Sequence, residues 1–183
     1  MMENKLSRRR FLGAAAAASA LAAMPFNGFG ALAQSVAGAK PNSKFGGVQI
    51  GAITYSWRSM PSTPKDIINY CLQAGISSIE LMGNVAEDYL GLPPSPPRPA
   101  KDATQQQKDD YEKAAAAASE AQKKWRLAVS MEKYAELRKM FNDAGINIHI
   151  VKFSPAGLSD EEIDYSFKAA KAMGAKGITN EIG

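Results

Sequence analysis

The chain has 183 residues, 45% of them hydrophobic, and a formal net charge of +4. This composition is typical of one globular domain. Residues 1–33 carry four basic residues and one acidic residue, which leaves 18 basic and 17 acidic groups in residues 34–183. Residues 34–183 are thus almost neutral and lack the basic surface that binding to a phosphate backbone requires. We therefore expect no nucleic-acid partner.

Residues 1–33 have the organisation of an export signal. Three arginines at 8–10 precede an apolar run over 12–24 that is too short to span a bilayer, and Ala-Leu-Ala at 31–33 offers a cleavage site. The segment SRRRFL at 7–12 resembles a twin-arginine signal. This resemblance predicts bacterial export by the twin-arginine translocase to a periplasmic or secreted location. A general secretory signal or an uncleaved amphipathic anchor is the alternative.

A first strand and helix follow a linker over 34–47. The segment GVQIGAITYSW at 47–57 predicts a strand, and STPKDIINYCLQAG at 62–75 has a helix cap at Thr63 and a stop at Gly75. One face of this helix is apolar and consists of Ile67, Ile68, Cys71 and Leu72. The single cysteine, Cys71, therefore predicts a buried, inert thiol and excludes an intrachain disulfide.

The same pattern of helix, glycine and β-branched run then recurs. Strands are predicted at 76–83, 146–153 and 176–182, and helices at 130–145 and 159–174. The first of these helices buries Tyr134, Leu137 and Phe141, and the second has a capping box (Ser159 and Glu162) and an apolar stripe of Ile163, Phe167 and Ala170. Repeated βα units predict an α/β fold with a parallel sheet and right-handed crossovers.

An insertion over 84–126 interrupts this pattern in the second βα connection. Its five prolines between 93 and 99 predict a stiff, extended piece, and the residues after them predict an exposed helix. The insertion could act as a lid, as a dimer arm or as a solvated decoration.

Repeated βα units occur in two parallel folds, the doubly wound sheet and the (βα)8 barrel. The segment ITYSWRSMPSTP after the first strand has no glycine-rich turn, which disfavours a nucleotide-binding doubly wound fold. A (βα)8 barrel needs about 250 residues, whereas four predicted strands already occupy residues 48–182. The chain is then either part of a larger barrel or a small open sheet.

Four segments, at 50–60, 74–84, 125–155 and 158–182, resemble the sugar phosphate isomerase/epimerase family, whose barrels are related to xylose isomerase. The likeness is closest to its exported, twin-arginine branch and extends from about Val48 to Gly183. It implies a (βα)8 TIM barrel of which residues 48–183 form the N-terminal half, with about the first four βα strands. It also implies a carbohydrate substrate and a possible homo-oligomer, and it predicts that this fragment alone is inactive.

The resemblance implies a divalent metal (Mn, Mg, Co or Zn), held by acidic residues and histidines mainly from the second half of the barrel. Such a metal polarises sugar oxygens while a carboxylate pair moves a proton between carbons. Glu181, at the end of the fourth strand, is expected to be catalytic and to ligate the metal or neighbour a ligand. The other metal ligands are expected beyond Gly183, the last residue of this sequence. A structural salt bridge is the alternative role for Glu181.

Other candidates lie on the first three strands. Glu80 is expected to be catalytic, to bind a substrate hydroxyl or to orient a ligand, with a structural carboxylate as the alternative. Lys152 could meet an anionic or carbonyl group, whereas His149 is expected to be a satisfied core imidazole.

Aromatic residues and arginines after the first strand and before the third helix complete the candidates. Tyr55, Trp57 and Arg58 could contact a sugar, because aromatic faces pack on C–H surfaces and arginine forks onto hydroxyls. Packing at the rim is the alternative for these three. Trp125 and Arg126 could do the same or only anchor their helix.

Three functions are compatible with this sequence. The preferred one is metal-assisted proton transfer on a carbohydrate by a sugar isomerase or epimerase, acting on a free, oxidised or glycosidic sugar. The alternatives are a non-catalytic secreted carbohydrate-binding barrel and a metal-dependent phosphodiesterase on the same fold. The near-neutral charge and the absence of histidine on the first two strands disfavour the phosphodiesterase.

Overall fold

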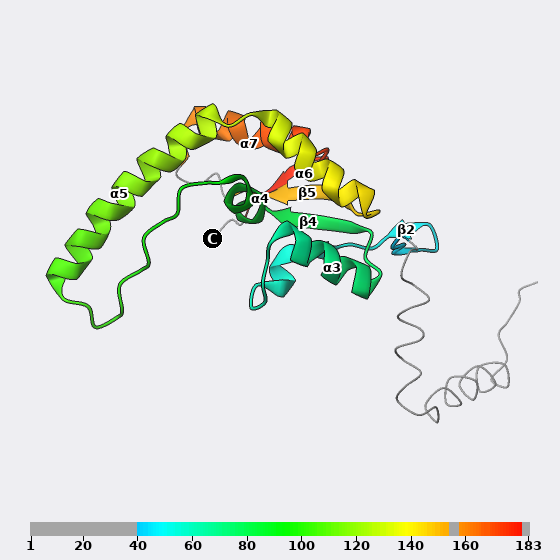
Figure 1. Cartoon of the computed structure of the whole chain (residues 1–183), viewed down its shortest axis with the longest axis horizontal. Coiled ribbons are helices and arrows are strands. Elements are labelled where there is room, and N and C mark those ends of the chain that lie inside the picture. The colour runs from blue at the N-terminus through cyan, green and yellow to red at the C-terminus, as the bar shows by residue number, and fades with distance from the viewer. Residues whose placement is uncertain (1–39, 154–157, 181–183) are drawn as a thin grey trace, which may run out of the picture. The chain divides into compact units, whose positions relative to one another are not determined.

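The computed structural model describes residues 40–153 and 158–180 (Figure 1). The export signal over 1–33 and residues 34–39 of the expected linker lie outside these residues, and so do the candidate Glu181 and the final residue, Gly183. The predicted extent of the barrel half up to Gly183 is therefore described only as far as residue 180. Within the described residues, no helix is long and apolar enough to cross a membrane.

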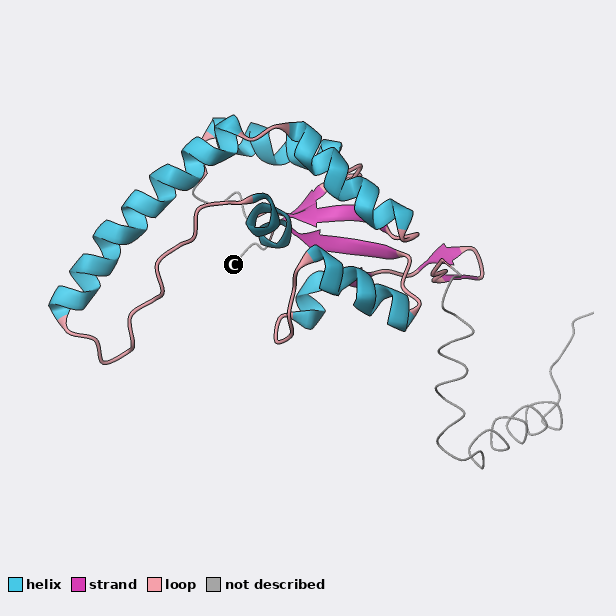
Figure 2. Ribbon diagram, in the orientation of Figure 1, coloured by secondary structure: helices cyan, strands magenta, loops and turns pink. Residues whose placement is uncertain are grey.

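A four-stranded parallel sheet organises the described residues. Its strands are neighbours in the order in which they occur in the chain: β3 (Ala52–Ile53), β4 (Ser78–Met82), β5 (Asn147–Lys152) and β6 (Ile178–Thr179). Figure 2 shows the arrows of β4 and β5 pointing in the same direction. The prediction of an α/β fold with a parallel sheet is therefore confirmed.

Three helices connect these strands, and their ends follow the predicted signals. They are α3 (Pro64–Ala74), α6 (Met131–Asp143) and α7 (Asp160–Ala172). The Thr63 side chain accepts a hydrogen bond from the backbone of Asp66 at the start of α3. Gly75 ends the helix with a φ of 68°, a left-handed conformation that glycine adopts without steric cost.

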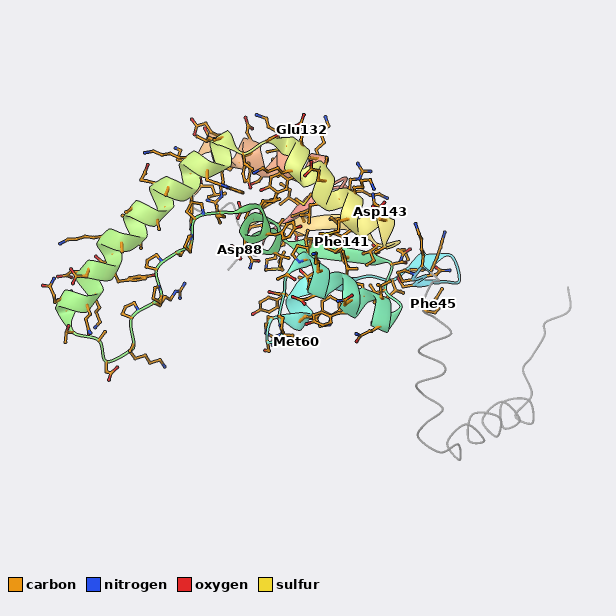
Figure 3. All side chains as sticks on the ribbon, viewed as in Figure 1. Phe45, Met60, Asp88, Glu132, Phe141 and Asp143 are labelled. Atoms are coloured by element: carbon orange, nitrogen blue, oxygen red, sulfur yellow. The ribbon has the colours of Figure 1, made fainter. Side chains whose placement is uncertain are left out.

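One face of the sheet packs on the helices and forms the core. Ile79 and Leu81 of β4 and Ile148 and Val151 of β5 are almost fully buried. Helix residues cover them, among them the predicted Tyr134, Leu137 and Phe141, together with Ile67 and Cys71. Figure 3 shows Phe141 beside the sheet. Burial raises the pKa of the Cys71 thiol to about 11, in agreement with the predicted inert cysteine.

A bulge in β5 allows both ends of this strand to contribute to the core. Ile79 pairs with Ile148, but the next residue, Glu80, pairs with Ile150, so that His149 is the additional residue. Because side chains alternate along a regular strand, residues three apart face opposite ways unless a bulge intervenes. The bulge therefore permits Ile148 and Val151 to face the helices together.

The predicted first strand is in fact divided, which corrects the sequence analysis. A hairpin of β1 (Lys44–Phe45) and β2 (Val48–Gln49) precedes β3, and a short 3-10 helix, η2 (Thr54–Trp57), follows it. The hairpin turn consists of Gly46 and Gly47, both with positive φ, as a tight antiparallel turn requires. Residues 44–47 of the expected linker are therefore part of the hairpin.

Serine side chains attach the hairpin to the amino-terminal end of β4. The backbone N–H of Ser43 donates to Ser77 Oγ at 3.0 Å, and the N–H of Ser77 donates to Ser43 Oγ at 2.9 Å. Gln49 Nε2 also donates to Ser43 Oγ at 2.8 Å. This reciprocal bonding places Gln49 beside the first residues of the sheet.

The insertion forms two helices rather than one. An unpredicted helix, α4 (Gly83–Leu90), follows β4 directly, and the predicted exposed helix is α5 (Gln105–Ala128), which has no buried residue. Figure 1 shows the extended segment leading away from α4 and α5 leading back toward α6. Gln122 Nε2 donates to Pro93 O at 2.9 Å, so the proline segment is bonded to α5.

The apolar stripe predicted for α7 is wrong at two of its three positions, since only Ala170 is buried as predicted. Phe167 is 60% exposed, and Ile163 is only partly buried. Two of the residues that the helix buries are polar, Glu162 and Ser166. The full buried face consists of Glu162, Tyr165, Ser166, Ala169 and Ala170. Hydrophobic periodicity misidentifies this face because Glu162 is buried as a partner of Arg126 rather than as an apolar residue.

Gly83, at the junction of β4 and α4, has no room for a side chain. A Cβ at this position would lie 2.7 Å from Phe153 Cδ1 and 2.8 Å from the Lys152 carbonyl oxygen. We expect Gly83→Ala to lower the free energy of unfolding by about 1–3 kcal/mol, because this clash outweighs the helix propensity gained with alanine. Urea denaturation measures the change. Gly177→Ala is the control, since its Cβ would meet nothing within 4 Å; equal losses would contradict the steric argument.

Candidate functional site

The second face of the sheet carries the candidate site. Ile53, Glu80 and Ile150 lie on this face, opposite the core residues of the same strands, and all three are only partly buried. We call it the open face. A hollow of about 370 Å³ lies on it and reaches from Gln49 of the hairpin to Glu80 and His149 in the middle of the sheet.

Glu80 is held by a residue two strands away. Thr179 Oγ1, in β6, donates a hydrogen bond to Glu80 Oε1, in β4. The bond crosses the open face over β5, the strand that separates the two residues. The carboxylate of Glu80 is therefore held in a fixed position by a hydrogen bond. It borders the hollow, on the face of the sheet opposite the core.

The two candidates on β5 occupy different positions. His149, at the bulge, lines the hollow and is partly exposed, so it lies on the open face rather than inside the apolar core. Lys152 is the last residue of β5 and is paired in register with both Met82 and Thr179. It lies at the carboxyl-terminal edge of the sheet, where sites form in parallel α/β proteins.

Residues after β3 divide into two groups. Arg58 Cζ lies 4.7 Å from the centre of the Tyr55 ring, a cation–π contact, and both residues are exposed. Trp57 instead lies 5.6 Å, centre to centre, from the ring of Tyr70 in α3. Tyr55 and Arg58 thus form an accessible pair, whereas Trp57 packs against a helix.

Arg126 is the centre of a buried polar cluster that joins four helices. Its Nε donates to Glu87 Oε1 of α4 at 2.8 Å, its Nη2 donates to Glu87 Oε2 at 3.3 Å, and its Nη1 donates to Glu162 Oε1 of α7 at 3.1 Å. Tyr165 donates to Glu87 Oε1 at 2.9 Å. Because this uses the only proton of Tyr165, the hydroxyl of Tyr134 in α6 is the donor in the bond between the two tyrosines.

These five residues, Glu87, Arg126, Tyr134, Glu162 and Tyr165, are called the Arg126 cluster. Burial alone would lower the pKa of Arg126, but the hydrogen bond and charge of Glu87 raise this pKa above its ordinary value. Burial alone would raise the pKa of Glu162. The hydrogen bonds from the Ser159 N–H and from Arg126, together with the charge of Arg126, outweigh burial and hold this pKa below its ordinary value of 4.5. The cluster is therefore a charged, anchored unit of the fold.

A smaller cavity of about 160 Å³ borders this cluster at the carboxyl-terminal ends of β4 and β5. Asn84, Glu87, Arg126 and Lys152 contribute to its lining. The sequence predicts Arg126 only as a sugar contact or an anchor and assigns no role to Glu87. The sequence signal for Glu87 is that this acidic residue stands among apolar residues: Leu81, Met82, Val85, Ala86 and Leu90.

A metal ion requires several ligand side chains that converge on one point. Among residues 40–153 and 158–180, no three His, Cys, Asp or Glu side chains lie close enough together to hold a metal ion. On the open face, Glu80 and His149 are the candidates for such ligands. The described residues alone therefore do not fit a divalent metal. Glu181, the expected ligand, is not among them, and the remaining ligands were expected beyond Gly183, so the predicted ligand set stays a prediction.

Comparisons with known proteins add nothing to this geometry. No family model matches the chain, and neither does any curated protein or solved structure.

Removing the charge of Arg126 would leave two buried carboxylates without their partner. We expect Arg126→Met to lower the free energy of unfolding by about 3–5 kcal/mol. The matched control is Lys123→Met, because Lys123 pairs with Glu161 at 3.7 Å with both side chains exposed; this control should cost no more than about 1 kcal/mol. Chemical denaturation compares the two, and a similar cost for both would show that the Arg126 cluster does not stabilise the fold.

The lowered pKa of Glu162 makes part of the stability pH-dependent. Its contribution is present above the ordinary value of 4.5 and is lost as the pH falls through the lower value of the folded state. We expect Glu162→Gln to be less stable than the wild type near neutral pH, with a difference that narrows below pH 4.5. Unfolding curves recorded between neutral and acidic pH test this. A difference that stays constant with pH would contradict it, and Glu136→Gln, on the exposed side of α6, is the control.

Proposed function

We propose that this protein is related to sugar isomerases and epimerases and contributes the N-terminal half of a (βα)8 barrel. The order of the sheet supports this. Strands β3, β4, β5 and β6 are neighbours in chain order and all parallel, as successive strands of such a barrel are. In a doubly wound sheet the order reverses at a switch point.

The distribution of helices supports the same proposal. Right-handed crossovers that always lead to the next strand on the same side put all their helices on one face of the sheet. The core here joins α3, α6 and α7 to the same residues of β4 and β5, and Glu80 and Ile150 lie on the other face. In the proposed barrel, the open face is the inner wall.

Glu80 is the observation that carries the functional part of the proposal. It is a carboxylate on the proposed inner wall, held by Thr179 and bordering the hollow. A carboxylate accepts hydrogen bonds and is suited to binding the hydroxyl groups of a sugar. The exposed pair of Tyr55 and Arg58 after β3 offers an apolar ring and a guanidinium to the same class of ligand.

The proposal includes a divalent metal (Mn, Mg, Co or Zn) with Glu181 as one ligand and the others beyond Gly183. Since the described residues do not form a ligand set, no step of a mechanism is assigned to the metal here. The proposal also includes export by the twin-arginine translocase, on the basis of the SRRRFL segment at 7–12.

Carbohydrate binding by the full chain tests the proposal. With isotope-labelled protein, we expect unphosphorylated aldoses or ketoses to shift NMR signals of β4 and β5 more than phosphorylated ones. Glu80→Gln should weaken this binding about tenfold, as loss of a hydrogen bond to a charged group does. Glu136→Gln, an exposed change of the same kind on α6, is the control and should bind as the wild type does.

The outcomes separate the candidate functions. Absence of binding by every sugar, or equal binding by Glu80→Gln, would contradict the proposed site. In a protein that contains the complete metal site, binding without isomerisation or epimerisation when Mn²⁺, Mg²⁺, Co²⁺ or Zn²⁺ is added would favour the non-catalytic carbohydrate-binding barrel. The preferred function requires turnover by a protein that contains the complete metal site.

A further inference from the structure

We propose that Thr179 is a positioning residue that directs the carboxylate of Glu80 toward the carboxyl-terminal edge of the sheet. The proposal rests on the function proposed above, because it deepens the role of the same carboxylate. Thr179 was not a candidate in the sequence analysis, and it lies in a strand of only two residues, Ile178 and Thr179.

The strand register shows the direction of the Glu80 side chain. Glu80 pairs with Ile150 of β5, whereas Thr179 pairs with Lys152 of the same strand. The hydroxyl that holds Glu80 therefore belongs to a position two residues further along the sheet than Glu80 itself. A glutamate in the middle of β4 thus has its carboxylate bonded at the level of the last residue of β5.

This displacement matters because ligands of parallel α/β proteins bind at the carboxyl-terminal ends of the strands. From the middle of β4, Glu80 borders the hollow that extends toward the hairpin. The bond to Thr179 turns its carboxylate toward the level of Met82 and Lys152, where β4 and β5 end. Through this hydrogen bond, Glu80 lies in the middle of the sheet but directs its carboxylate toward the carboxyl-terminal edge.

The bond to Thr179 also involves only one of the two carboxylate oxygens of Glu80. Oε1 accepts the hydrogen bond from Thr179. The second oxygen, Oε2, is an acceptor of the kind that a hydroxyl of a polyol or sugar requires. Threonine suits this role, because its β-branched side chain has restricted rotation about χ1 in a strand and holds the hydroxyl in place.

The first arm of the test uses the full chain and requires no sugar. We expect the hydroxyl proton of Thr179 to be protected from exchange with water in NMR spectra of the wild type and to lose this protection in Glu80→Ala. The hydroxyl of Thr104, at the exposed start of α5, is an internal reference. A Thr179 proton that exchanges as fast as that of Thr104 would overturn the proposal, whether or not a sugar binds.

The second arm measures the affinity for the unphosphorylated aldoses and ketoses used with Glu80→Gln. We expect Thr179→Val, which keeps the shape of the side chain, to bind about tenfold more weakly, and Thr179→Ser to restore most of the affinity. Unchanged binding by Thr179→Val, or failure of Thr179→Ser to restore it, would overturn the positioning role.

The two arms distinguish failure of this inference from failure of the proposed function. A protected Thr179 proton in a protein that binds no sugar would contradict the proposed function and support the placement of Glu80 by Thr179. Sugar binding that depends on Glu80 but not on Thr179 would support the function and overturn the inference.

Discussion

A guanidinium held between two buried carboxylates is the interaction on which the arrangement of the helices depends. Arg126 is the only basic group in its cluster, so Glu87 and Glu162 require it as their counter-charge. Loss of one partner of a buried pair costs more free energy than the pair itself contributes. The three residues come from α5, α4 and α7, and their pairing therefore makes the insertion part of the fold, although α5 has no buried residue of its own.

The same pairing connects the insertion to the ends of the strands. Glu87 lies in α4, which follows β4 without a loop, and at this junction a side chain on Gly83 would clash with Phe153 just after β5. The carboxyl-terminal ends of β4 and β5 thus lie between the Arg126 cluster on one side and the open face on the other. Helix anchoring and the candidate site share one edge of the sheet, but they use different carboxylates: Glu87 and Glu162 for the fold, and Glu80 for the site.

Local signals predicted the repeated elements well, because caps, glycine stops and β-branched runs act over a few residues. The parallel sheet, α3, α6 and the buried Cys71 follow from such signals. The hairpin, the buried face of α7 and the bond between Thr179 and Glu80 could not be predicted in this way. Glu162 is buried because Arg126, 36 positions away in the chain, pairs with it, and Thr179 meets Glu80 from 99 positions away. Periodicity carries no information on pairings at such distances.

The bulge at His149 has a consequence for how this strand can change in evolution. Ile148 and Val151 both face the core because one residue of β5 is unmatched on β4. Deletion of that residue would restore regular alternation and leave Ile148 and Val151 on the core face, because Ile150 and Val151 already pair in register with Glu80 and Leu81. The bulge is thus the point at which β5 can lose one residue without turning Val151 away from the core, and the length of this strand should vary there first in homologous sequences.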